Sequence, residues 1–207
     1  MKHSDKGQRF FERLLAYSAE PDAERRRTME KGLWEDFGVK GAVFVLDMSG
    51  FSLLTQRYGI IHYLSLVRRM QATTDPIIQS HGGKVVKYQA DNCFARFPDT
   101  REAVEAAVAL NLAFTAENII TPPELDISIS CGIDYGDFLL IEEDDLYGNA
   151  VNMACKLGED LASPGEILVT AQAMERVTGQ PFRYDPVDFN VSGVRIEACS
   201  VRFRAGE

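Results

Sequence analysis

The sequence predicts an α+β sandwich, in which helices pack on a sheet, for most of its 207 residues. From residue 41 onward, strand-like and helix-like patterns follow one another in the order β-α-α-β-β-α-β-β-α-β. This order is that of a ferredoxin-like sandwich. A hydrophobic content of 45%, with 10% aromatic residues, is enough for a proper core in one domain of this length.

Residues 1–40 are predicted to form a helical extension, separate from a domain that covers residues 41–207. The first helix is indicated by an apolar stripe at near-helical spacing: Phe10, Phe11, Leu14, Leu15 and Tyr17. Residues 25–34 form a second, highly charged helical pattern. We expect both helices to pack on the domain or on a second copy of it. A signal-transmitting coiled segment is the alternative.

An apolar run over residues 41–46 ends at Asp47 and is followed by Met48-Ser49-Gly50-Phe51-Ser52 and a helical pattern. This pattern predicts a buried strand that delivers a carboxylate to its carboxyl end. Ser49 and Ser52 offer caps for the next helix, and Gly50 allows close backbone approach. The N–H groups of such a helix hold phosphate oxygens, while an aspartate holds a divalent cation. From this motif alone, an aspartate that simply caps a helix remains the alternative.

A second carboxylate is expected near the first. Two short strand-like runs within residues 82–97 flank Ala90-Asp91-Asn92, which predicts a hairpin with Asp91 at its tip, beside the Asp47 strand. Two carboxylates from neighbouring strand ends are what a two-metal phosphoryl-transfer site needs.

A third motif spans residues 145–157, where Asn152 and Lys156 are four positions apart on a predicted helix and therefore share one face.

The remaining elements follow in order. Residues 53–80 are predicted to be helical, with weak points at Gly59 and Pro76 and a stop at Gly82-Gly83. A capping box of Asp99 and Glu102 opens a helix that reaches about residue 117. Strict alternation predicts a strand over 126–134, with 138–141 as its partner across a turn at 135–137. A helix over 149–161 and strands over 167–170, 182–190 and 195–203 complete the chain.

Taken together, three motifs resemble the catalytic domain of class III nucleotidyl cyclases over about residues 41–170. They stand in the family's order and spacing: Asp47-x-Ser49-Gly50-Phe51, Lys87-x3-Asp91 and Asp145-x-Tyr147-Gly148-x3-Asn152-x3-Lys156. The resemblance implies an α+β sandwich of the ferredoxin-like βαββαβ type, as the order of elements does.

The resemblance also implies roles for individual residues. Asp47, Asp91 and the Met48 carbonyl correspond to the ligands of two Mg²⁺ or Mn²⁺ ions, and the Ser49-Gly50-Phe51 turn to a phosphate-binding segment. Lys87 and Asp145 correspond to the pair that reads the base. An ammonium that donates to adenine N1 and a carboxylate that accepts from N6 indicate ATP as the substrate.

The resemblance gives Asn152 the task of orienting the ribose, and places Lys156 where the family has a transition-state arginine. It implies active sites between the subunits of a head-to-tail homodimer, because Lys87 and Asp91 share one hairpin but belong to opposite sides of a nucleotide.

The sequence departs from the family's pattern at three positions. Lys156 keeps the charge of the usual arginine without its planar fork. Ala90 replaces a glycine, and we expect the turn to be reshaped around Asn92. A late lysine of the family falls near residues 192–194, where Arg195 is a candidate substitute. These departures leave two alternatives open. One is a guanylate or pyrimidine nucleotide cyclase, and the other is an inactive homologue that acts as a regulatory nucleotide-binding module.

Composition excludes several other classes. A net charge of −9 and a pI near 4.9 argue against a nucleic-acid binder. The four cysteines form no C-x-x-C pair, and three histidines make a His-based zinc site improbable. Since no apolar run approaches the roughly 20 residues of a membrane span and no signal peptide is found, we expect a cytoplasmic protein without a membrane partner.

Overall fold

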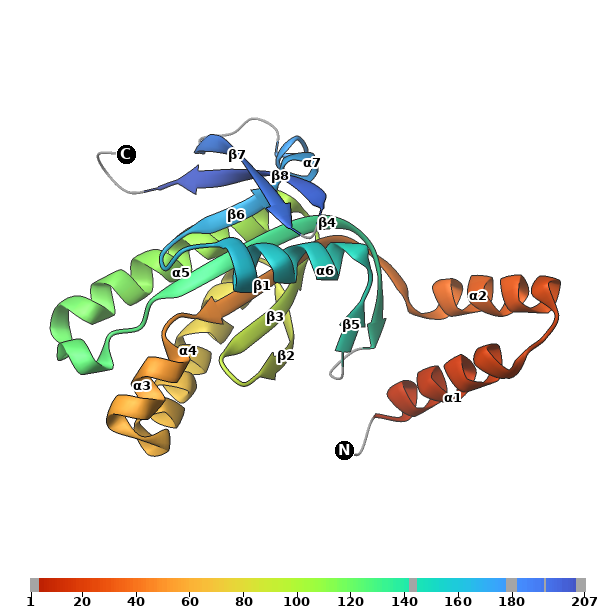
Figure 1. The fold of residues 1–207 in the computed structure, drawn as a ribbon, viewed down its shortest axis with the longest axis horizontal. Helices are drawn as coiled ribbons and strands as arrows, with labels where there is room; N and C mark the ends of the chain where they lie inside the picture. The colour runs from red at the N-terminus through yellow and green to blue at the C-terminus, as the bar shows by residue number, and fades with distance from the viewer. Residues whose placement is uncertain (1–3, 142–144, 178–181, 192, 204–207) are drawn as a thin grey trace.

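A computed structural model describes residues 4–141, 145–177, 182–191 and 193–203. Within these residues the strands form one eight-stranded sheet in the order β2-β3-β1-β4-β6-β8-β7, with β5 paired to β4 (Figure 1). This confirms the predicted α+β class.

The middle of the sheet is β1 (Gly38–Met48), which runs antiparallel to β3 (Asn92–Phe97) on one side and to β4 (Ile129–Ile141) on the other. Next to β4 lies β6 (Ile167–Thr170), which is parallel to it. Side chains of a strand alternate between the two faces. The Ala42, Phe44 and Leu46 side chains therefore belong to one core cluster, and those of Val43 and Val45 to another.

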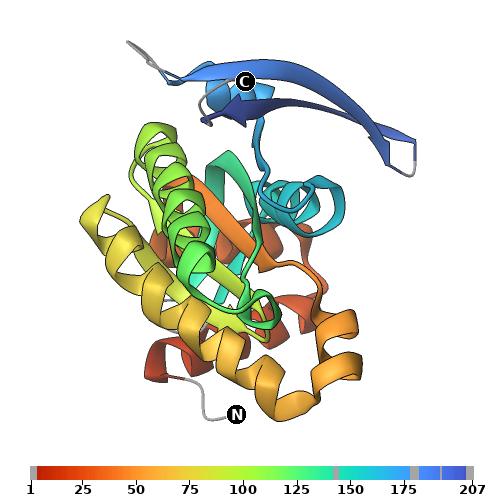
Figure 2. The same ribbon diagram turned by 90° about the vertical axis from the view of Figure 1, so that its left-hand side faces the viewer.

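Helices cover the two faces unequally. On the face of Phe44 pack α4 (Ile60–Ser80) and α5 (Thr100–Ile120), the yellow and green helices that lie in front of the sheet in Figure 2. The other face carries α6 (Asn149–Cys155) and a π-helical stretch, Lys156–Leu161. Shorter elements connect these layers: α3 (Phe51–Tyr58), β2 (Lys84–Gln89), a 3₁₀ turn (Pro123–Leu125), β5 (Asp145–Tyr147) and α7 (Ala171–Met174).

The strands β7 (Arg183–Val191) and β8 (Val194–Arg202) form a long hairpin at the far edge of the sheet, which arches over the top of the molecule in Figure 2.

The two helices predicted within residues 1–40 are present as α1 (Asp5–Ala19) and α2 (Ala23–Phe37), capped by the side chains of Ser4 and Asp22. The two helices lie at the β5 end of the sheet (Figure 1). Phe10, Leu33 and Phe37 are buried there with Ile141 of β4, so the extension packs on the domain itself.

By length and apolar composition, α5 also resembles a membrane-spanning helix. The apolar composition of α5 is accounted for by the core of the domain. Its side chains packed against the sheet are buried: Ala103, Val104, Leu110 and Phe114.

Several helix boundaries agree with the sequence analysis. Gly59 separates α3 from α4, and Pro76 lies inside α4. Gly82, at φ 75°, ends that helix, and the Gly83 N–H bonds to the Ile78 carbonyl. Asp99 caps α5, but its carboxylate accepts from the Thr100 N–H, and no bond from Glu102 back to Asp99 is present among the described residues. The capping box is therefore incomplete.

The hairpin predicted across residues 135–137 is wrong. β4 is one continuous strand, and β1 pairs with it from Met48↔Ile129 to Gly38↔Leu139. Gly136 does not serve a turn. A Cβ at this position would lie 3.4 Å from the Ala150 Cβ of α6, an ordinary van der Waals contact. The partner of the late part of β4 is β5.

Candidate active site

The two predicted metal-binding aspartates come together at one end of the central strands. Asp47 pairs in register with Asn92, the residue that follows Asp91 at the tip of the β2–β3 hairpin. Burial, the charge of Asp91 and the charge of Glu159 raise the pKa of Asp47 to about 7. Two carboxylates that repel each other in a half-buried position suit a hard divalent cation, which prefers oxygen ligands and relieves the repulsion.

Two residues near this pair escaped the sequence analysis. Tyr63 of α4 is buried, and its burial, a hydrogen bond with Asp91 and the charges of Asp91 and Asp47 raise its pKa above the usual value. Glu159 lies close enough to Asp91 and Lys87 for both to affect it, and burial raises its pKa. Glu159 stands three positions after Lys156, just beyond the third motif, and helical periodicity places it on the same side of the helix as Lys156. The sequence holds no such signal for Tyr63.

The turn after β1 differs from the prediction in its capping. The N-cap of α3 is Gly50, at φ 93°, and the helix begins at Phe51 without a side-chain cap. Ser49 therefore precedes the cap, with its N–H bonded to the Ser128 carbonyl, and Ser52 lies inside the helix. Only glycine enters the left-handed conformation without cost, so Gly50 makes the turn. Because glycine has no side chain to cap the helix, the first N–H groups of α3 receive no hydrogen bond from a capping side chain. The side chain of Phe51 lies outside the described part of the structure.

The hairpin tip keeps a left-handed residue. Ala90 has φ 53°, and among the described residues it alone has a positive φ without being a glycine. Asn92 begins β3 and pairs regularly with Gln89. The expectation that the turn is reshaped around Asn92 is therefore wrong, and Ala90 carries the strain of a Cβ in this region.

Lys87 and Asp145, far apart in sequence, form an ion pair of 2.7 Å between β2 and β5. Asp145 Oδ1 also accepts from the Leu146 N–H at 2.8 Å, and Oδ2 accepts from the Tyr147 hydroxyl at 3.0 Å. The Lys87 ammonium also lies 4.6 Å from the centre of the Phe94 ring. Both predicted base-reading residues are thus held in one place.

Asn152 and Lys156 are one helical turn apart, since the Lys156 N–H bonds to the Asn152 carbonyl. The helix widens from α to π at Lys156. In the described residues, no hydrogen bond or ion pair joins either side chain to Asp47 or Asp91. One chain therefore brings Asp47 near Asp91 and pairs Lys87 with Asp145. No hydrogen bond or ion pair in the described residues connects the two aspartates to Asn152 and Lys156.

Two glycines set the height of this helix above the sheet. A Cβ on Gly132 of β4 would lie 2.1 Å from the Ala154 carbonyl oxygen, and one on Gly158 would lie 3.0 Å from the Val45 carbonyl oxygen. The Ser130 hydroxyl donates to the Gly158 carbonyl at 2.9 Å. The π-helical stretch is therefore seated directly on β1 and β4 at Gly158. Glu159 is the next residue along the chain.

Arg195, the candidate for the late phosphate-binding cation, lies on β8 with an exposed side chain. It forms ion pairs of 3.1 Å with Asp188 and 3.2 Å with Glu197. The structure therefore gives it carboxylate partners on its own hairpin.

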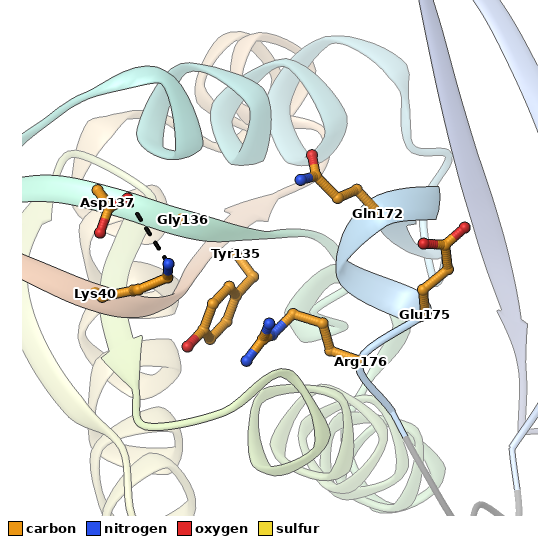
Figure 3. Close-up of a pocket in the computed structure, with 7 residues that line it drawn as sticks. All are labelled: Lys40, Tyr135, Gly136, Asp137, Gln172, Glu175 and Arg176. Carbon is orange, nitrogen blue, oxygen red and sulfur yellow. Dashed lines mark ion pairs between the residues drawn. The ribbon is translucent and has the colours of Figure 1, made fainter.

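A cavity of about 570 Å³ lies away from these groups. Figure 3 shows the Arg176 guanidinium beside the Tyr135 ring, at 3.7 Å from its centre, and Lys40 facing Asp137 at 3.9 Å. Lys40 and Asp47 are an odd number of positions apart in β1, so their side chains point to opposite faces. The described lining of this cavity includes none of the predicted site residues.

Comparison with known proteins points to one family. The model of the adenylate and guanylate cyclase catalytic domain matches residues 40–198. A putative adenylate cyclase 3 of Rhizobium meliloti is 32% identical over 152 residues, which are 73% of this chain and 25% of the relative. An adenylate cyclase of Streptomyces coelicolor is 29% identical over 136 residues, which are 66% of this chain and 34% of the relative. The chain thus spans only about a quarter to a third of the length of these relatives.

Solved structures show the same fold. The adenylate/guanylate cyclase/hydrolase of Silicibacter pomeroyi is 27% identical with a TM-score of 0.64, over 81% of this chain and 99% of that one. The catalytic core of a rhodopsin-guanylyl cyclase with converted specificity, in complex with ATPαS, has a TM-score of 0.69 at 20% identity, again over 81% and 99%.

Proposed function

The chain belongs to the family of adenylate and guanylate cyclase catalytic domains, and on that premise we propose that it converts ATP to 3′,5′-cyclic AMP and pyrophosphate. The observation that carries this proposal is the Lys87–Asp145 ion pair. An ammonium donates a hydrogen bond and a carboxylate accepts one, which matches N1 and the N6 amine of adenine. Guanine carries a proton on N1 and an acceptor at position 6, so it would meet the wrong partner at both places. The adenylate cyclase names of two relatives point the same way.

The reaction joins the ribose 3′-oxygen to the α-phosphorus in line and breaks the bond to the pyrophosphate oxygen. Asp47, Asp91 and the Met48 carbonyl would hold two divalent cations, Mg²⁺ or Mn²⁺, which when bound neutralise phosphate charge and favour ionisation of the 3′-hydroxyl. The first N–H groups of α3, at Gly50 and Phe51, would bind phosphate oxygens.

Asn152 would orient the ribose, and Lys156 would donate to the charge that develops on the phosphate. Removal of such a transition-state donor costs about 10²–10³ in rate. A lysine in place of arginine therefore weakens the site by at most this factor and does not abolish it.

We further propose that the complete site forms between two copies of the chain in a head-to-tail homodimer. Asn152 and Lys156 have no hydrogen bond or ion pair with Asp47 or Asp91 in the described part of one chain. A second copy, turned about a two-fold axis, can place its Asn152 and Lys156 opposite the aspartates of the first, and each dimer then has two sites.

The proposal is tested by product analysis. Purified protein is incubated with each nucleoside triphosphate and Mg²⁺ or Mn²⁺, and the products are separated by chromatography, with Asp47→Ala beside the wild type. We expect cyclic AMP from ATP with the wild type alone. A different cyclic product would keep the chemistry and overturn the assigned base. Metal-dependent ATP binding without any product would favour the inactive, regulatory homologue.

Base recognition is tested separately with Lys87→Glu. The variant places a carboxylate beside Asp145 and removes the donor to adenine N1, so kcat/KM for ATP should fall at least tenfold more than that for GTP. An unchanged preference for ATP would refute the role of Lys87.

A further inference from the structure

The helical extension contacts Tyr147, whose hydroxyl donates to Asp145 of the proposed base-reading pair, through one aromatic stack. Phe10 of α1 is almost fully buried, and its ring stacks on that of Tyr147, with centres 5.9 Å apart and planes within 8° of parallel. Phe10 is held in turn by Phe37 of α2, edge to face at 5.0 Å. Tyr147 is 38% exposed, so the extension supplies a fixed surface for one face of an otherwise accessible ring.

The hydroxyl of the same tyrosine holds the carboxylate that pairs with Lys87. Asp145 Oδ1 is occupied by the Lys87 ammonium and the Leu146 N–H, whereas Oδ2 accepts from the Tyr147 hydroxyl. A carboxylate bonded through one oxygen can still rotate about its Cβ–Cγ bond, whereas a bond to each oxygen fixes its plane. The plane of the Asp145 carboxylate sets the direction in which the lone pairs of its oxygens can accept a hydrogen bond from the base.

The strand that carries these residues is short, and its middle residue, Leu146, is buried in the core cluster of Val43 and Val45. β5 is three residues long and pairs with Leu139, Leu140 and Ile141 of β4. Two of these, Leu139 and Ile141, pack in the same cluster as Phe10. The extension therefore stabilises both the ring of Tyr147 and the strand segment against which β5 lies.

We propose that Tyr147 is a positioning residue for base selection, and that Phe10 of the extension acts on the same selection through the Tyr147 ring. The inference rests on the proposed function, because it assigns to Tyr147 and Phe10 the orientation of the Asp145 carboxylate that would read the base. It extends the substrate site to a segment that lies outside the matched family region, residues 40–198.

The test compares Tyr147→Phe, Phe10→Leu and the double variant. Tyr147→Phe keeps the stack and loses the hydroxyl, so the preference for ATP over GTP in kcat/KM should fall about fivefold, mainly through KM for ATP. Phe10→Leu keeps apolar volume and loses the stack, and should lower the preference about twofold to threefold. In the double variant the preference should equal that of Tyr147→Phe, because Phe10 acts through the hydroxyl.

Two control variants separate positioning from loss of stability. Tyr184→Phe changes an exposed tyrosine of β7, and Leu33→Ala removes a buried side chain from the Phe10 cluster without touching the ring stack. Both should leave the preference unchanged, although Leu33→Ala lowers the unfolding midpoint. A preference that falls equally in Leu33→Ala, or independent effects of the two single variants in the double variant, would overturn the proposal.

A physical readout distinguishes this inference from the proposed function. The Leu146 amide proton, bonded to Asp145 Oδ1, is followed by NMR in the absence of nucleotide. Its chemical shift should change in Phe10→Leu and Tyr147→Phe but not in Tyr184→Phe. If the wild type forms no cyclic product, the proposed function fails. The chemical shift of the Leu146 amide proton still tests whether Phe10 and Tyr147 orient the Asp145 carboxylate. An unchanged shift in both variants refutes the coupling even if cyclic AMP is formed.

Discussion

At the scale of single residues, the charge of Asp47 is set by its surroundings. Burial, Asp91 and Glu159 raise its pKa to about 7 when no metal is bound, whereas in the unfolded chain it titrates near 3.8. The folded protein thus binds the extra proton between these values, so this group stabilises the fold below pH 4 and the contribution is lost as pH rises through 7.

In EDTA we therefore expect the free energy of unfolding to fall between pH 5 and pH 8, by on the order of 1–2 kcal/mol after allowance for solvent screening. Urea unfolding at each pH measures it, with Asp47→Asn as the control that should flatten the dependence. Added Mg²⁺ should recover stability mainly at the higher pH. An equal slope in Asp47→Asn would show that other groups cause the dependence.

Ala90 stores strain at the same site. Its φ of 53° places a Cβ in the left-handed region, which costs roughly 1 kcal/mol or more, and glycine enters this region freely. Ala90→Gly should raise the free energy of unfolding by about 0.5–1 kcal/mol, and Ala90→Asn by less, as thermal or urea unfolding will show. If Ala90→Gly destabilises the protein, the tip has another conformation in solution.

At the scale of elements, the seating of α6 and its π-helical continuation on the sheet depends on Gly132 of β4. A Cβ on Gly132 would lie 2.1 Å from the Ala154 carbonyl oxygen, while one on Gly136 meets only the Ala150 Cβ at 3.4 Å. Gly132→Ala should therefore cost about 2–4 kcal/mol and displace Lys156, whereas Gly136→Ala in the same strand should cost under about 1 kcal/mol. Urea unfolding of both variants measures the difference, and equal costs would contradict this account of the packing.

At the scale of the whole molecule, the proposed homodimer predicts complementation between defective variants. Asp47→Ala lacks the metal half of the site, and the double variant Asn152→Ala/Lys156→Ala lacks the other half. Neither should form product alone. After mixing and subunit exchange, half of the dimers are mixed and each has one intact site, so activity should reach about a quarter of the wild-type value. Continued inactivity of the mixture, with exchange confirmed by sedimentation of labelled chains, would contradict shared sites.

The sequence by itself determined the class of fold, the strand that carries Asp47, and the hairpin that brings Asp91 beside it, because each depends on local hydrophobic and turn patterns. It also identified Asn152 and Lys156 as neighbours, since helical periodicity alone places them one turn apart.

Only the tertiary structure decided which glycines make turns and which make room for a helix. Gly136 looks like a turn residue in sequence, but pairing with the full length of β1 keeps β4 extended, whereas Gly132 leaves the space that α6 needs. Likewise, the hydrogen bond of Tyr63 with Asp91, the effect of the Glu159 charge on Asp47, and the stacking of Phe10 on Tyr147 join residues from distant elements. Such contacts depend on how whole helices pack on the sheet, which no local pattern in the chain records.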